Sequence, residues 1–91
     1  MNDEILKRII SEYGTTAQID VAVEEMSELT KALMKWKRSG RTTKENAEII
    51  DELADVKIMC RQMELIFECE EDVEHVIKYK LDRQIERMKK H

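Results

Sequence analysis

The chain has 91 residues and a formal net charge of −4, with 40% charged and 4% aromatic side chains. This length suits one small domain, so we expect residues 1–91 to form a single domain. The acidic balance argues against a general nucleic-acid binder, which normally carries a basic surface. No apolar run approaches the roughly 20 residues that span a bilayer, and the acidic start of the chain lacks a signal-peptide pattern. We therefore expect no nucleic-acid partner and no membrane partner.

The cysteine content agrees with an intracellular protein. Cys60 and Cys69 are the two cysteines, and their spacing does not match a metal-ligand motif. Two unpaired thiols fit a reducing compartment, so we expect a cytoplasmic protein.

Helix is the predicted structure nearly throughout, because the chain has no proline and has glycine only at positions 14 and 40. The first helix is expected over about residues 3–13, with Asn2 as its N-cap and Gly14 at its end. The second opens at residue 15 or 16 and continues to about residue 38, where Ser39-Gly40 stops it.

The third and fourth predicted helices also have recognisable ends. Thr42 and Glu45 form a capping-box pattern, and the helix that follows is expected to run to about Phe67. The fourth helix follows the acidic residues 70–72, which suit a helix N-terminus, and ends in the basic residues 89–91, as the helix dipole favours.

Short connections and small size together predict the assembly. The connection around Gly40 is short, so the second and third helices should lie antiparallel as a hairpin. A chain this small would leave much of its apolar surface exposed, so we expect a homodimer or homotetramer. The predicted fold class is all-α, with four helices and an antiparallel hairpin core assembled into an oligomeric bundle.

The second and third helices each carry an acidic pair three residues apart. Glu25 pairs with Glu28, and Glu52 pairs with Asp55. The i, i+3 spacing puts both carboxylates of a pair on one helix face. With 20 acidic residues in the chain, such pairs arise freely, and most of them are solvated faces.

Placement around the helix separates these two pairs from the others. Glu25 and Glu52 each fall on the flank of a predicted apolar arc, and Glu28 and Asp55 lie just beyond it. The arc of the second helix contains Ala22, Val23, Met26, Leu29 and Leu33. The arc of the third contains Ile49, Leu53, Val56, Cys60, Met63 and Phe67. An antiparallel hairpin would bring four carboxylates together at the edge of this core, with Cys60 buried as an inert thiol.

Half-buried carboxylates repel one another and lose solvation unless cations neutralise them. Oxygen-only ligands select hard cations, which favours Mg²⁺ or Mn²⁺ over zinc. Iron is disfavoured because neither His75 nor His91 has a glutamate three residues before it. The acidic pairs therefore predict a magnesium site.

The acidic pattern resembles a known family. Glu24-Glu25-x-x-Glu28, followed after 23 residues by Glu52-x-x-Asp55, matches the signature of the MazG-like all-α nucleotide pyrophosphohydrolases. Glu-Leu-Ala-Asp-Val at the second motif and Tyr13-Gly14 before the first also resemble the family. The likeness covers roughly residues 13–88.

The resemblance implies an activity and a set of site residues. It implies hydrolysis of a nucleoside triphosphate between its α- and β-phosphates, giving the monophosphate and pyrophosphate, in an enzyme that trims the nucleotide pool. By that likeness Glu25, Glu28, Glu52 and Asp55 would hold Mg²⁺. Glu24 is the nearest spare carboxylate that could orient or deprotonate the attacking water, so Glu24 and Glu25 are the catalytic candidates.

A further likeness lies near the C-terminus. The family often carries a basic and amide pattern, which here reads Lys80, Gln84 and Arg87, with glutamine in place of the usual asparagine. Glutamine keeps the amide of asparagine but has a longer reach. With Arg83 on the same face, these residues are candidates for binding the β- and γ-phosphates. The alternative is a basic helix end or salt bridges to a neighbouring chain.

Two residues of the second helix are further candidates for substrate contact. Trp36 could stack on a nucleobase, although packing at the hairpin end or in an oligomer interface is slightly favoured. Gln18 could contact the base or sugar, or cap its helix instead. Lys31 and Lys35 lie on the polar side of the helix, and we interpret them as a solvated face.

Two other functions remain open from the sequence. Phosphoribosyl-ATP pyrophosphohydrolase shares the fold and the reaction, although nothing in the chain points to that larger substrate. A non-enzymatic helical oligomerisation or regulatory module would explain the size and charge equally well. It would not explain acidic residues on an apolar flank, where Leu or Ala would add stability.

Overall fold

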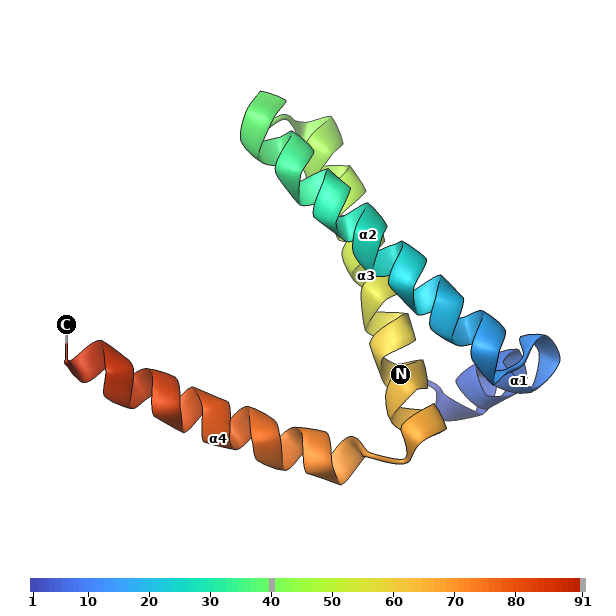
Figure 1. Cartoon of the computed structure of the whole chain (residues 1–91). Helices are drawn as coiled ribbons and strands as arrows, with labels where there is room; N and C mark the ends of the chain where they lie inside the picture. Colours follow the sequence, from blue (N-terminus) through green and yellow to red (C-terminus); the bar gives the residue numbers. More distant parts are fainter. Residues whose placement is uncertain (40, 91) are drawn as a thin grey trace.

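A computed structural model describes residues 1–39 and 41–90, and all regular structure in these ranges is helical. Figure 1 shows four helices, which are α1 (Asp3–Tyr13), α2 (Thr15–Ser39), α3 (Thr43–Phe67) and α4 (Glu70–Lys89). The predicted all-α class is confirmed. The predicted ends of the first three helices agree with the observed ones to within about one residue, whereas α4 already includes the acidic residues 70–72 that were expected to precede it. Gly40 and His91, which the sequence placed in a turn and at the C-terminus, lie outside the described residues.

Local hydrogen bonds explain where the helices begin and end. The Asn2 side chain accepts hydrogen bonds from the backbone N–H groups of Glu4 and Ile5, which confirms it as the N-cap of α1. Gly14 ends α1 with φ of 92°, a conformation that costs glycine little. The capping box predicted for α3 is present, with Thr42 as N-cap and Glu45 bonded back to the Thr42 N–H.

Helices α2 and α3 make the most extensive contact in the chain and lie side by side in Figure 1. Near the end of α2, the Trp36 indole N–H donates to the Asn46 side-chain oxygen at 2.8 Å, close to the start of α3. Lys35 forms an ion pair with Glu48 at 3.3 Å. The contacts therefore join the last turns of α2 to the first turns of α3.

Helix α1 closes the other end of the α2–α3 pair and contacts both helices. Its Leu6 side chain is buried. Arg61 of α3 donates to both carboxylate oxygens of Asp3, at 3.0 and 2.7 Å. This bidentate contact lowers the pKa of Asp3 below its ordinary value. An apolar contact and an ion pair thus hold α1 against the pair.

The face that α2 and α3 bury differs from the apolar arcs predicted from the sequence. Val23 of α2 and Phe67 of α3 were predicted in the core, yet they are 60% and 61% exposed. Cys60 was predicted to be buried and is exposed. The contact face instead follows the flank that carries the carboxylates, and its most buried side chains are Gln18, Ala22, Ala32, Glu45, Met59 and Gln62. Within one chain the predicted arcs are therefore covered only in part: Ala22 is buried, and the half-buried arc residues are Leu29, Ile49, Val56 and Met63.

Helix α4 extends away from the other three helices, and Figure 1 shows it projecting beside the end of α3. Among the described residues it contacts only α3, and none of its residues is buried. An ion pair between Arg61 and Glu70, at 3.2 Å, anchors its first turn. Its apolar side chains, including Val76, Leu81 and Ile85, are exposed.

None of the described helices is long and apolar enough to cross a membrane.

Candidate metal centre

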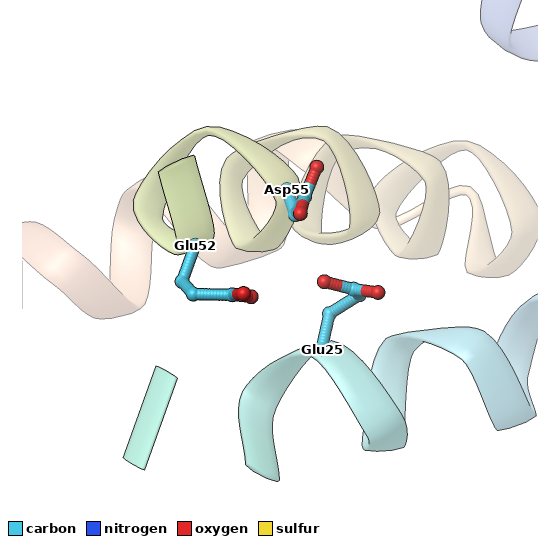
Figure 2. A group of neighbouring side chains, drawn as sticks. All are labelled: Glu25, Glu52 and Asp55. Atoms are coloured by element: carbon cyan, nitrogen blue, oxygen red, sulfur yellow. The ribbon is translucent and has the colours of Figure 1, made fainter. Parts of the chain in front are cut away.

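Three carboxylates from two helices meet in the middle of the α2–α3 pair. Glu25 projects from α2 toward Glu52 and Asp55 of α3, as Figure 2 shows. One oxygen of each carboxylate lies within 4.8 Å of the corresponding oxygens of the other two. All three side chains are half-buried. These three residues form what we call the carboxylate triad.

The spacing of small and apolar residues along the contact face brings the triad together. Ala22 and Ala32 are buried in α2 on either side of Glu25, and such small side chains let the two helix backbones approach closely. On α3, Glu52 and Asp55 are three residues apart and so project from one face. The buried Met59 lies one turn further along that face. Glu25 therefore lies half-buried between the two helices, opposite the two carboxylates of α3.

The triad is electrostatically strained without a cation. Burial is the largest cause that raises the pKa of Glu25 to about 7, followed by its hydrogen bond and charge interaction with Asp55 and by the charge of Glu52. The Oε2 atom of Glu52 is buried and has no hydrogen-bond partner among the described residues. An orphaned carboxylate oxygen in such a place costs stability unless a proton or a cation satisfies it.

The donor set fits a hard divalent cation. The triad offers only carboxylate oxygens, which Mg²⁺ and Mn²⁺ accept and which zinc and copper sites rarely use alone. A cation among these oxygens would neutralise the repulsion and give Glu52 Oε2 a partner. Acidic clusters on protein surfaces are common without an ion, but these three side chains are half-buried and point toward one another.

The fourth predicted ligand lies outside the triad. Glu28 is exposed, and its carboxylate pairs with the Lys31 ammonium at 3.3 Å on the same helix. It lines a small cavity together with Glu52, so it stands beside the triad. The neighbouring Glu24, predicted as a candidate base, is also exposed and is not part of the triad.

The predicted substrate contacts of α2 lie at opposite ends of the helix. Trp36 packs at the end of the α2–α3 pair, where its N–H is bonded to Asn46 and the Arg41 guanidinium lies 4.7 Å from its ring centre. It lies 11 residues from Glu25, about 16 Å along the helix axis. Gln18 is buried, and it lies seven residues before Glu25 at about 10 Å.

The predicted phosphate-binding residues of α4 are not brought to the triad within one chain. Lys80, Arg83, Gln84 and Arg87 are all exposed. Their helix makes contact with α3 alone among the described elements and extends away from the α2–α3 pair (Figure 1). The Arg83 guanidinium lies over the Tyr79 ring of its own helix at 5.5 Å from the centre.

Three residues near the triad were not singled out from the sequence as site residues. Gln62 is 1% exposed, and its Oε1 atom has no partner within the described chain. It follows Asp55 by seven residues, which places it on the same face, and that spacing was a usable signal. Lys35 and Glu48 line the cavity beside Glu52. They come from different helices, so their proximity could be predicted only from the register of α2 against α3.

No protein-family model, curated protein or solved structure matches the chain.

Proposed function

We propose that the chain is a Mg²⁺-dependent pyrophosphohydrolase that cleaves nucleoside triphosphates to monophosphates and pyrophosphate. The observation that carries the proposal is the carboxylate triad, in which Glu25, Glu52 and Asp55 face one another within 4.8 Å. The same residues belong to the acidic motifs that resemble the MazG-like enzymes. Glu28, beside Glu52 in the adjoining cavity, would complete the ligand set by leaving Lys31.

Three half-buried acids support an enzyme over a helical scaffold. A scaffold would gain stability from Leu or Ala at Glu25 and Glu52, because both side chains lose solvation there. The raised pKa of Glu25 and the orphaned oxygen of Glu52 are costs that folding alone does not require. Such costs are typical of sites shaped for ligands or catalysis.

Phosphoryl transfer needs positioned charge more than covalent chemistry. The cation would supply that charge to the phosphate oxygens and lower the pKa of a bound water. The chain's own carboxylates would orient the substrate through the cation. A bound cation would keep Glu25 ionised as a ligand, so the exposed Glu24 is the candidate that would accept the proton of the water.

We further propose that α2 and α3 form an antiparallel hairpin that is the unit of a homo-oligomer. Many large apolar side chains of this hairpin and of α4 are exposed in one chain. A second copy of the chain would cover them. In that assembly the partner's α4 would bring its basic residues to the triad of the first chain. This arrangement explains why Lys80 and Arg87 lie on a helix that leaves the rest of its own chain.

The activity is tested with a panel of eight ribo- and deoxyribonucleoside triphosphates in the presence of Mg²⁺. Pyrophosphate and monophosphate are measured for the wild type, for Glu52→Gln, and for the wild type with EDTA. We expect pyrophosphate release by the wild type alone, together with a Mg²⁺-dependent rise in its melting temperature. The panel also reports the base and sugar preference.

The matched control is Asp51→Asn, which removes an exposed acid next to Glu52 without touching the triad. This variant should hydrolyse the substrate as the wild type does. Absence of pyrophosphate release across the panel, with no thermal shift on adding Mg²⁺, would contradict the proposal and favour an interaction module.

A further inference from the structure

A cavity of about 230 Å³ adjoins the carboxylate triad on the side of the α2–α3 turn. Glu52 belongs to both, so the cavity and the triad share a wall. The cavity is lined by Glu28, Lys31, Ala32, Lys35, Glu48 and Glu52. Two lysines of α2 therefore line the same cavity as Glu28 and Glu52, two of the proposed metal ligands.

Both lysines are neutralised by carboxylates of the same cavity. Lys31 pairs with Glu28 at 3.3 Å, and Lys35 pairs with Glu48 across the two helices at 3.3 Å. The lysine side chains are 74% and 45% exposed. Ion pairs this exposed contribute little to stability. Either ammonium group can therefore exchange its carboxylate for another anion at little cost.

We propose that Lys31 and Lys35 bind the β- and γ-phosphates of the substrate, an inference that rests on the proposed function. Both sit on one face of α2, four residues apart, and Lys31 lies one turn beyond Glu28. A triphosphate whose α-phosphate lies at the triad would extend its remaining phosphates into the adjoining cavity. The ammonium groups there are mobile point charges, which suit phosphate oxygens.

The ion pair between Lys31 and Glu28 suggests an order in which the cation binds before the substrate. Glu28 can hold the Lys31 ammonium or a cation, but its exposed carboxylate cannot serve both fully. If Glu28 joined the triad in holding a cation, Lys31 would lose its carboxylate partner and could pair with a phosphate of the substrate. Glu28 would thereby link cation binding to the phosphate site.

Lys31 and Lys35 differ from the other exposed lysine of this part of α2 because they line the cavity. Lys37, two residues beyond Lys35 on the same helix, is exposed and does not line the cavity. A general attraction between a basic surface and a polyanion would involve Lys37 as much as Lys31 or Lys35. The cavity predicts that loss of Lys31 or Lys35 weakens phosphate binding and that loss of Lys37 does not.

The test measures binding of inorganic tripolyphosphate by isothermal titration calorimetry with Mg²⁺ present. We compare the wild type with Lys31→Met, Lys35→Met and the control Lys37→Met. Either cavity variant should weaken tripolyphosphate binding about tenfold, as expected for loss of a charge-assisted contact, whereas Lys37→Met should bind as the wild type does. Binding of Mg²⁺ alone should not weaken in Lys31→Met, because Glu28 is then free. In kinetic assays the KM for the triphosphate should rise.

Binding of a nucleoside monophosphate provides the internal comparison. Because it lacks β- and γ-phosphates, its affinity should be the same in all four proteins. Wild-type hydrolysis with unchanged tripolyphosphate binding in both cavity variants would overturn this inference and leave the proposed function standing. A wild type that neither hydrolyses triphosphates nor binds tripolyphosphate with Mg²⁺ would overturn both.

Discussion

Glu25 is the residue at which folding and ionisation are most closely linked. Its pKa rises from an ordinary 4.5 to about 7, chiefly because the side chain loses water on burial. A carboxyl whose pKa is raised by folding holds its proton more tightly in the folded state. Its contribution to stability is therefore complete below about pH 4.5 and is lost as the pH rises through about 7.

This linkage predicts the effect of Glu25→Gln in the metal-free protein. At pH 8 the variant should be more stable than the wild type, because glutamine removes a charge that repels Asp55 and Glu52. The rise in melting temperature should be a few degrees, since 1 kcal/mol moves a domain of this size by about 4–8 °C. At pH 5 the two proteins should melt within about 1–2 °C of each other, since wild-type Glu25 is then protonated.

Thermal melts with EDTA at both pH values provide the measurement, at equal protein concentration. Glu24→Gln is the control, because Glu24 is exposed and outside the triad. The difference in melting temperature between Glu24→Gln and the wild type should be the same at pH 5 and at pH 8. An equal difference between Glu25→Gln and wild type at pH 5 and pH 8 would argue against the raised pKa.

At the residue scale, the sequence predicts contacts between residues that are close to one another along the chain. The caps at Asn2 and Thr42 were predictable because their hydrogen bonds reach only two or three residues along the chain. The meeting of Glu25 with Asp55 depends on the register of two helices, and it was expected from their places beside the apolar arcs of an antiparallel hairpin. The Lys31 partner of Glu28 was within reach of the i, i+3 rule. The spacing of Gln62 from Asp55 indicated a shared face, but its burial depends on tertiary packing.

At the scale of elements, the start of α3 is fixed by more than one hydrogen bond. Glu45 is buried and accepts hydrogen bonds from the Ser39 hydroxyl at 2.7 Å and from the Thr42 N–H at 3.0 Å. These contacts lower the pKa of Glu45, the Ser39 bond being the largest cause. The capping box thus also ties the start of α3 to the end of α2.

Thr42→Ala should therefore destabilise the whole protein and not only the first turn of α3. We expect a loss of about 1 kcal/mol, which is typical for removing a threonine N-cap. The loss is measured by urea unfolding followed by circular dichroism at a fixed protein concentration. Thr43→Ala is the matched control, because Thr43 is the first helical residue and not the cap. Equal losses in both variants would contradict a capping role for Thr42.

The buried face of the α2–α3 pair shows where element-scale prediction ends. Apolar periodicity correctly gave the lengths of both helices, because an uninterrupted amphipathic pattern with caps has well-defined ends. It placed Val23 and Phe67 in the core, whereas both are exposed and the contact face contains the half-buried Glu25 and the buried Gln62. Periodicity measures how apolar a face is, and it does not say which neighbour covers that face.

At the scale of the whole molecule, α4 is the element whose position the sequence could not supply. Its boundaries were predicted from its charged ends, but its direction depends on the contact of its first turn with α3. Glu68, at the end of α3, adopts a left-handed conformation with φ of 51°, and Glu70 then pairs with Arg61. These features lead α4 away from the other helices. Its basic residues therefore lie away from the triad of their own chain.

If the partner's α4 completes the site, two inactive variants should restore activity when mixed. Glu52→Gln disables the metal ligands of its own chain, and Arg87→Gln disables the α4 that would serve its partner. After unfolding and refolding together in equal amounts, half of the dimers would contain one chain of each kind, and each of these would have one intact site. The mixture should recover about a quarter of wild-type activity if exchange is random in a two-fold dimer.

The separate refolded variants are the controls, and pyrophosphate release is the measurement. A site built within one chain would give no recovery, because every triad would lack either Glu52 or the Arg87 of its own α4. Light scattering of the mixture establishes that the chains have associated. Recovery requires association, because one chain must supply the triad and its partner the basic helix. The assay therefore tests the oligomer and the shared site together, and an associated but inactive mixture would contradict the shared site alone.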